Sequence, residues 1–109
     1  MAFDLALAAR VRKTLAGRND VVEKAMFGGL TFMVADKMCC GIIKDELMIR
    51  LAPSTDLAEF GSPDVRACDL MKKPMRGFFQ VSAKGCVDQK SVGSWVRRAL
   101  SYTLSLSQK

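Results

Sequence analysis

Histidine is absent from this chain of 109 residues, and tryptophan and tyrosine occur only once each. Without histidine, neither a Ser-His-Asp nor a Cys-His catalytic arrangement can form, and a mixed Cys/His zinc site is excluded. The four cysteines form no CxxC pair, and the phosphate-binding patterns GxGxxG and GxxxxGK[ST] do not occur. We therefore expect a protein that is not an enzyme and that carries no cofactor and no metal.

Long apolar runs are also absent, since no stretch approaches the roughly 18 to 20 residues that cross a bilayer. The first residues carry Asp4 early and have no basic segment before it, unlike a secretory leader. With 50% hydrophobic and 26% charged residues, the composition is that of a globular domain. We expect one domain over residues 1–109, located in the cytoplasm and not in a membrane.

Apolar residues recur at helical spacing near both ends of the chain. The first stripe, with one residue in every four, consists of Phe3, Leu7, Val11 and Leu15. It predicts an amphipathic helix over about residues 3–16, which Gly17 ends. The second stripe consists of Val92, Trp95, Val96, Ala99, Leu100 and Thr103. It predicts a C-terminal helix, and Asp88 is a candidate for its N-cap.

Between these helices the apolar residues alternate with a period of two, which is typical of strands. The strands expected from this alternation cover about residues 22–35 (bent at Gly28-Gly29), 38–44, 46–51, 66–71 and 77–82. A short helical stretch follows Pro53 and ends near Gly61. The predicted order is α-β-β-β-α-β-β-α. This order indicates an α+β fold with a largely antiparallel sheet of about five strands and helices packed on one face.

Two motifs and one tryptophan suggest a family. Residues 24–32 read KAMFGGLTF, residues 73–78 read KPMRGF, and Trp95 follows late in the chain. Over nearly its whole length the chain resembles the N-terminal domain of TfoX/Sxy, the bacterial competence regulators, and their single-domain relatives. The resemblance implies a fold similar to secretion chaperones, a non-enzymatic role and often a homodimer. The motif residues, to which we assign structural roles, are Met26, Phe27, Gly28, Gly29, Pro74, Met75, Gly77 and Trp95.

Positive charge is concentrated in the C-terminal part of the chain. Residues 1–69 contain nine Lys/Arg and ten Asp/Glu, whereas residues 70–109 contain eight and one, so the two parts carry −1 and +7 of the net +6. If the connection before the last strand and the final helix share one side, they form a patch that attracts an acidic partner or phosphates. Its candidate contact residues are Lys72, Lys73, Arg76, Arg97 and Arg98. The alternative is a solvated face that only keeps the protein in solution.

These observations favour a non-catalytic, cytoplasmic protein-interaction or regulatory module. The alternative is a nucleic-acid-associated accessory protein that uses the basic patch on phosphates, with strong salt dependence and little sequence discrimination. Few aromatic residues accompany the basic ones, namely Phe78, Phe79 and Tyr102, so a base-stacking platform has weak support. An enzyme is the third interpretation, because four carboxylates lie near expected strand ends: Asp36, Asp45, Glu46 and Asp69. Solvated charges ordinarily occupy such positions.

The sulfur-containing residues allow two further expectations. Cys39 and Cys40 are adjacent in an expected strand, so alternation predicts that their side chains point to opposite faces and bind no common metal. Redox sensing that involves Cys68 or Cys86 is an alternative to a purely structural role. Met33 and Met48 belong to the expected strands as well. If they share an exposed sheet face, a homodimer is the natural way to cover it.

Overall fold

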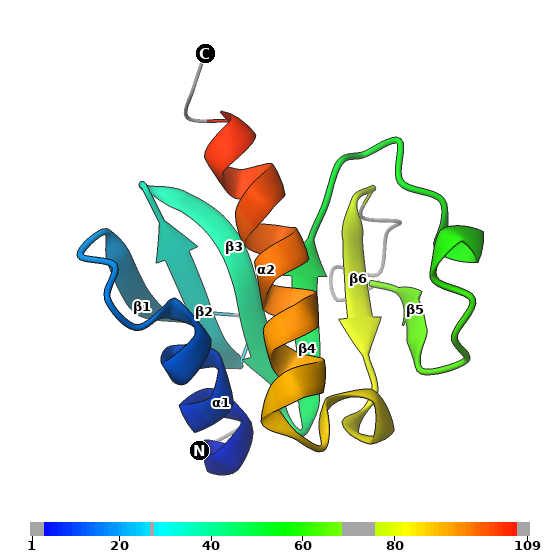
Figure 1. The fold of residues 1–109 in the computed structure, drawn as a ribbon, viewed down its shortest axis with the longest axis horizontal. Coiled ribbons are helices and arrows are strands. Elements are labelled where there is room, and N and C mark those ends of the chain that lie inside the picture. The colour runs from blue at the N-terminus through cyan, green and yellow to red at the C-terminus, as the bar shows by residue number, and fades with distance from the viewer. Residues whose placement is uncertain (1–3, 27, 69–75, 107–109) are drawn as a thin grey trace.

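Two helices pack on one face of a six-stranded sheet in the computed structural model, which describes residues 4–26, 28–68 and 76–106 (Figure 1). The helices are α1 (Leu5–Leu15) and α2 (Gln89–Leu106). The strands are β1 (Val21–Met26), β2 (Gly29–Val34), β3 (Lys37–Ile43), β4 (Glu46–Arg50), β5 (Val65–Ala67) and β6 (Phe78–Val81). Two short 3-10 helices, η1 (Leu57–Phe60) and η2 (Ala83–Cys86), complete the described elements.

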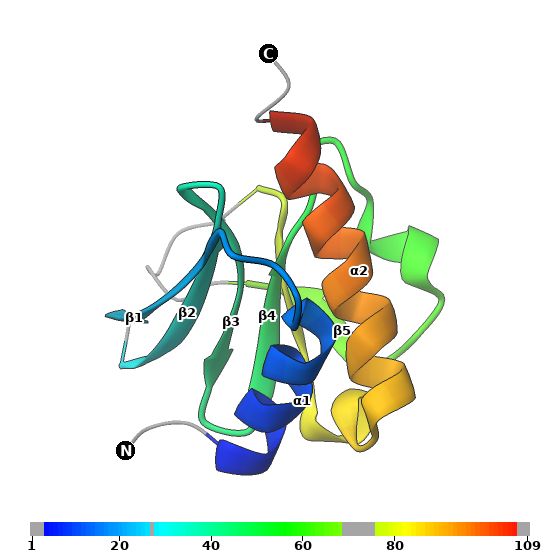
Figure 2. The same cartoon turned by 60° about the vertical axis from the view of Figure 1, so that its left-hand side comes forward.

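The strand order in the sheet is β1-β2-β3-β4-β6-β5, and every neighbouring pair is antiparallel. Helix α2 crosses β3 and β4 and packs beside α1, as the turned view shows (Figure 2). The predicted α+β class, the antiparallel sheet and the helices on one face are therefore confirmed. The expected likeness to secretion chaperones stays a prediction.

The segment expected as one bent strand over residues 22–35 forms two strands instead. Strands β1 and β2 pair antiparallel, with Val21 opposite Val34 and Met26 opposite Gly29. The chain reverses at Gly28, whose φ of +76° is in the left-handed region that favours glycine. A Cβ on Gly29 would overlap the backbone carbonyl of Ile42 on β3. The two glycines thus make a tight hairpin and a close strand contact, and the sheet gains a sixth strand.

Both helices begin directly after an aspartate whose side chain caps the first turn. The Asp4 carboxylate accepts hydrogen bonds from the N–H groups of Ala6 (2.8 Å) and Leu7 (3.1 Å). The Asp88 carboxylate accepts one from the N–H of Ser91 (2.8 Å), which confirms Asp88 as the N-cap. Helix α1 ends before Gly17, whose φ is +91°. The expected start of the first helix at Phe3 lies outside the described residues.

The hydrophobic core lies between the sheet and the two helices. The side chains of Phe32, Ile42, Leu47 and Ile49 point from three adjacent strands toward the helices and are fully buried. Both predicted helical stripes supply the opposite side of the core, chiefly through Leu7, Val11, Leu15, Val92, Val96 and Ala99. Because these side chains follow the predicted periodicities, the burial of apolar surface accounts for the arrangement of the layers.

The prediction that Cys39 and Cys40 point to opposite faces is wrong. Phe32 pairs with Cys40 but Met33 pairs with Met38, so Cys39 is the extra residue of a β-bulge. Both cysteines are buried in the core, and their side chains hydrogen-bond to each other. This bond lowers the pKa of Cys39, whereas the same bond together with burial raises the pKa of Cys40. The bulge cancels the alternation on which the prediction depended.

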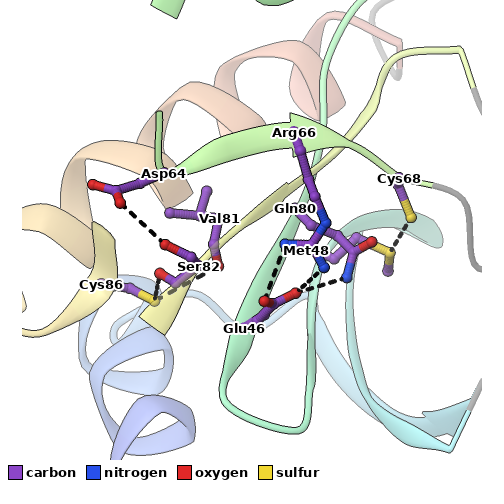
Figure 3. A network of polar contacts seen from close by, with 9 residues as sticks. All are labelled: Glu46, Met48, Asp64, Arg66, Cys68, Gln80, Val81, Ser82 and Cys86. Carbon is purple, nitrogen blue, oxygen red and sulfur yellow. Dashed lines mark hydrogen bonds and ion pairs between the residues drawn. The ribbon is translucent and has the colours of Figure 1, made fainter. Parts of the chain in front are cut away.

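The sheet face opposite the helices carries a polar network and a buried methionine (Figure 3). The Glu46 carboxylate forms an ion pair with Arg66 and accepts a hydrogen bond from the Gln80 amide (3.1 Å). Beside this network, Met48 is only 1% exposed, and its sulfur lies 3.8 Å from the Cys68 sulfur. Met48 therefore adds no exposed apolar surface, whereas Met33 is half-buried, and the homodimer stays a prediction.

Candidate ligand-binding groove

Two of the predicted contact residues lie together on the outer face of α2. Arg97 and Arg98 line a groove of about 670 Å³, and the side chains of Ser94, Ser101, Tyr102 and Ser105 extend this wall along the helix. A helical spacing of three or four residues places these side chains in one stripe, opposite the buried stripe of α2. The wall therefore combines two guanidinium groups with several hydroxyl groups.

The other wall of the groove is the segment that follows β4. It contributes Leu51, Ala52, Thr55 and Glu59. The Thr55 N–H donates to the Ala52 carbonyl (2.9 Å), which forms a turn, and the Asp56 carboxylate caps η1 by accepting from the N–H of Ala58 (3.0 Å). Local turn and cap chemistry thus holds this wall in place beside α2.

Aromatic rings hold Arg98 at the mouth of the groove. Its guanidinium carbon lies 4.8 Å from the ring centroid of Phe60 and 5.7 Å from that of Trp95. Phe60 makes edge-to-face contacts with Trp95 (5.5 Å) and Phe79 (5.1 Å), and the Trp95 indole N–H donates to the Gly85 carbonyl (3.2 Å). A guanidinium stacked on rings keeps its N–H edge free for a carboxylate or a phosphate.

A third arginine, Arg50, lies near the groove, and no sequence pattern singled it out. Its guanidinium carbon lies 5.7 Å from the Phe78 ring and 5.9 Å from the ring of Tyr102, which lines the groove. Phe78 is opposite Arg50 because β4 pairs with β6. Arg50 and Phe60 escaped prediction because contacts between distant segments bring them to this place, and no local pattern marks them.

The arginines differ in whether a carboxylate neutralises them. Arg12, Arg18 and Arg66 each form an ion pair, with Glu23, Asp20 and Glu46, respectively. Hydrogen bonds from the arginines lower the pKa of Glu23 and of Asp20. Within residues 4–26, 28–68 and 76–106, no carboxylate forms an ion pair with Arg97 or Arg98. The groove therefore exposes positive charge that these residues do not neutralise.

The remaining predicted contact residues do not join this groove within the described structure. Arg76 lines a separate cavity of about 480 Å³ with Pro53, Leu57 and Phe78. Thr55 contributes to both cavities, so the segment after β4 separates them. Lys72 and Lys73 lie outside the described residues. Among the described candidates, Arg97 and Arg98 line one cavity and Arg76 lines its neighbour, so the single patch stays a prediction.

The motif residues that the structure describes have packing roles. Gly77 has a φ of +83°, and its carbonyl accepts a hydrogen bond from the N–H of Leu51 (2.6 Å). A Cβ on Gly77 would overlap the Leu51 carbonyl, as one on Gly29 would overlap that of Ile42. Trp95 packs against the core through Phe60. The side chain of Met26 and the residues Phe27, Pro74 and Met75 lie outside the described part.

Metal-binding clusters and exposed thiols are both absent from the described part of the chain. No three His, Cys, Asp or Glu side chains there are placed to hold a metal ion. All four cysteines are free thiols and buried. Burial also raises the pKa of Cys86 to about 11, which disfavours the reactive thiolate. Among the described helices, none has the length and the apolar character needed to span a membrane.

The fold is a small two-layer α+β domain, and a groove beside α2 is lined by two arginines. The profile of the TfoX N-terminal domain matches residues 13–102. The chain therefore belongs to the TfoX N-terminal domain family, as the two motifs and Trp95 predicted. The chain matches no curated protein and no solved structure significantly.

Proposed function

We propose that this chain is a cytoplasmic, non-catalytic regulatory or protein-interaction module whose groove binds an acidic segment of a partner protein. The observation that carries the proposal is the pairing of Arg97 and Arg98 in one groove without a carboxylate partner among the described residues. Membership in the TfoX N-terminal domain family supports a regulatory or interaction role in a bacterium.

The groove has the chemistry that a carboxylate-rich segment requires. Guanidinium groups bind carboxylates through paired, charge-assisted hydrogen bonds, and hydroxyl groups add donors around them. Phe60 and Trp95 hold the Arg98 guanidinium in place, so less side-chain freedom is lost when a ligand binds. Glu59 on the facing wall repels an acidic ligand and confines it to the α2 side.

A fluorescein-labelled octaglutamate peptide is the probe that tests this proposal. We expect it to bind the wild-type protein and to bind Arg97→Ala and Arg98→Ala at least five-fold more weakly. Lys90→Ala is the matched control, because Lys90 is an exposed basic residue on α2 that does not line the groove. Fluorescence anisotropy at low salt measures all four proteins. Equal weakening by Lys90→Ala, or no peptide binding at low salt, contradicts the proposal.

A second candidate function is binding of nucleic acid, which the +7 charge of residues 70–109 favours. Phosphate contacts by Arg97 and Arg98 would make such binding steeply salt-dependent. The same three variants are titrated with a labelled DNA duplex and with its single strand. Binding of DNA that exceeds peptide binding and is lost in Arg97→Ala would replace the acidic protein with nucleic acid as the ligand.

A further inference from the structure

Strand β1 is the outer strand at one edge of the sheet, and its hydrogen-bonding pattern is known from its ladder to β2. The Ala35 N–H donates to the Asp20 carbonyl, and each later β1 residue is opposite its β2 partner in unbroken register. In an antiparallel ladder, hydrogen-bonded residues alternate with residues whose N–H and C=O groups point away. The backbone groups of Val21, Glu23 and Ala25 therefore point away from β2.

This edge is exposed on both faces within the described structure. Val22 keeps 49% of its surface exposed, and Glu23, Lys24 and Ala25 are exposed as well. No described strand pairs with β1 on its outer side. An edge strand of six residues with free backbone groups is a template for the addition of another strand.

We propose that β1 is a homodimer interface in which the β1 strands of two copies pair antiparallel, with Val22 opposite Val22 of the partner subunit. A two-fold axis perpendicular to the sheet relates the copies, so one residue must face its own counterpart. If the two-fold axis passed through Glu23 or Lys24, that residue would face its own counterpart, and two like charges would lie opposite each other, which is destabilising. Among the exposed positions 22–25, only Val22 and Ala25 avoid this. Centring on Ala25 would leave fewer paired residues before the chain reverses at Gly28, so Val22 is the favoured centre.

The register centred on Val22 also pairs opposite charges. Two residues from the axis on each side, Lys24 lies opposite Asp20 of the partner subunit. The Asp20 carbonyl already extends the β1–β2 ladder, so Asp20 is held in line with the strand. Asp20 already forms an ion pair with Arg18 of its own subunit, so Lys24 of the partner subunit would join that pair as a second cation. Apolar contact at the centre with opposite charges on each side makes this edge self-complementary.

The proposed interface is independent of the groove. The order β1-β2-β3-β4-β6-β5 places β1 at one side of the sheet, away from β4 and β6 (Figure 1). The groove is lined by α2 and by the segment after β4. Pairing through β1 would extend the sheet to twelve strands and leave both grooves open. The two proposals can therefore fail separately, because the oligomeric state tests one and peptide binding tests the other.

Cysteine substitutions on the edge test the register. In the proposed dimer, Val22 is a non-hydrogen-bonded pair, whose side chains are close enough for a disulfide. We expect Val22→Cys to form a covalent dimer with oxidised glutathione, which is reduced to two molecules of glutathione as the disulfide forms. Lys24→Cys, which is also exposed, is the matched control and should remain monomeric on a non-reducing gel. The four native cysteines are buried and give little background.

Two outcomes of this experiment would overturn the proposal. Crosslinking of Lys24→Cys with no crosslinking of Val22→Cys would contradict the register. A wild-type protein that is monomeric by light scattering at several hundred micromolar, together with no crosslinking of Val22→Cys, would contradict the interface.

Charge reversal is the second test, measured as the dimer dissociation constant by analytical ultracentrifugation. We expect Lys24→Asp and Asp20→Lys each to weaken dimerisation at least ten-fold, and the double variant to restore it to within three-fold. Lys84→Asp, an exposed lysine on η2, is the control for net charge. If all four variants have the same dissociation constant as the wild type, Lys24 and Asp20 do not meet across the interface and the proposed register is wrong.

Discussion

The guanidinium group of Arg97 lies over Gly93, one turn earlier in α2. A Cβ on Gly93 would come within 2.8 Å of Arg97 Nη1 and 3.4 Å of Arg97 Cζ. Glycine inside a helix is unfavourable because it loses much backbone freedom on folding. At this position it leaves the space in which the side chain of Arg97 lies along the helix. The position of one groove arginine thus depends on a missing methyl group.

Replacing Gly93 with alanine should stabilise the protein and displace Arg97. We expect the free energy of unfolding to rise by about 0.5 to 1 kcal/mol, because the atoms that must move belong to the end of a flexible side chain. Urea denaturation measures this change. In the Arg97→Ala background the same substitution should raise the free energy of unfolding slightly more, since no guanidinium has to move. A loss of stability in both backgrounds would contradict this account of Gly93.

Truncating Phe60 should loosen the outer wall of the groove. Its ring contacts Phe79, Trp95 and Arg98. Because Phe60 is half-buried, we expect Phe60→Ala to cost about 2 kcal/mol, less than a fully buried phenylalanine. Trp95 is the only tryptophan, so its emission should shift to longer wavelength. Leu57→Ala, at an exposed position of the same 3-10 helix, is the control and should leave the emission unchanged.

The β2–β3 hairpin should gain stability from a glycine at position 36. Ala35 and Asp36 have φ values of 51° and 66°, as in a type I′ turn, where glycine is favoured at the second position. Asp36→Gly should therefore raise the free energy of unfolding by about 0.5 to 1 kcal/mol. Asp45→Gly makes the same change in the next hairpin, where the positive φ is on Lys44, and should not stabilise. Thermal unfolding compares the two variants.

Stability should fall in alkaline solution because of the buried thiols. Burial raises the pKa of Cys86 from 9.0 to about 11, so the folded state holds this proton more tightly than the unfolded state. The stabilisation is complete below pH 9 and is lost as the pH rises to about 11, by roughly 2 to 3 kcal/mol. Urea midpoints between pH 8 and 11 should fall more steeply for the wild type than for Cys86→Ala. The urea midpoint of Cys86→Ala should still fall somewhat with rising pH, because the pKa of Cys40 is also raised.

Periodicity predicted most of the fold. The helical stripes placed α1 and α2 correctly, and the burial of Phe32 and Leu47 follows the alternation of their strands. The hairpin between β1 and β2 escaped prediction because residues 21–26 show no clear alternation of their own that would mark them as a separate strand. A glycine pair is compatible with a bend and with a full reversal, and only the partner strand decides between them.

The candidate site was only partly predictable for a related reason. Arg97 and Arg98 could be found because the polar face of an amphipathic helix is visible in its sequence. The facing wall could not be found, since the position of Thr55 beside α2 depends on where β4 ends and on the turn after it. Arg50 reaches the rings of Phe78 and Tyr102 through strand pairing and helix packing, which are contacts between distant segments.

The bulge at Cys39 makes β3 tolerant of a change in length. From Leu30 to Val34 the chain advances four residues, while β3 advances five between their partners, Ile42 and Lys37. Deletion of Cys39 would leave regular pairing on both sides, whereas deletion elsewhere in β3 would move every later side chain to the wrong face. Loss of this one residue would therefore straighten β3 and keep the same sheet, so the bulge is a place where the chain can change length without a change of fold.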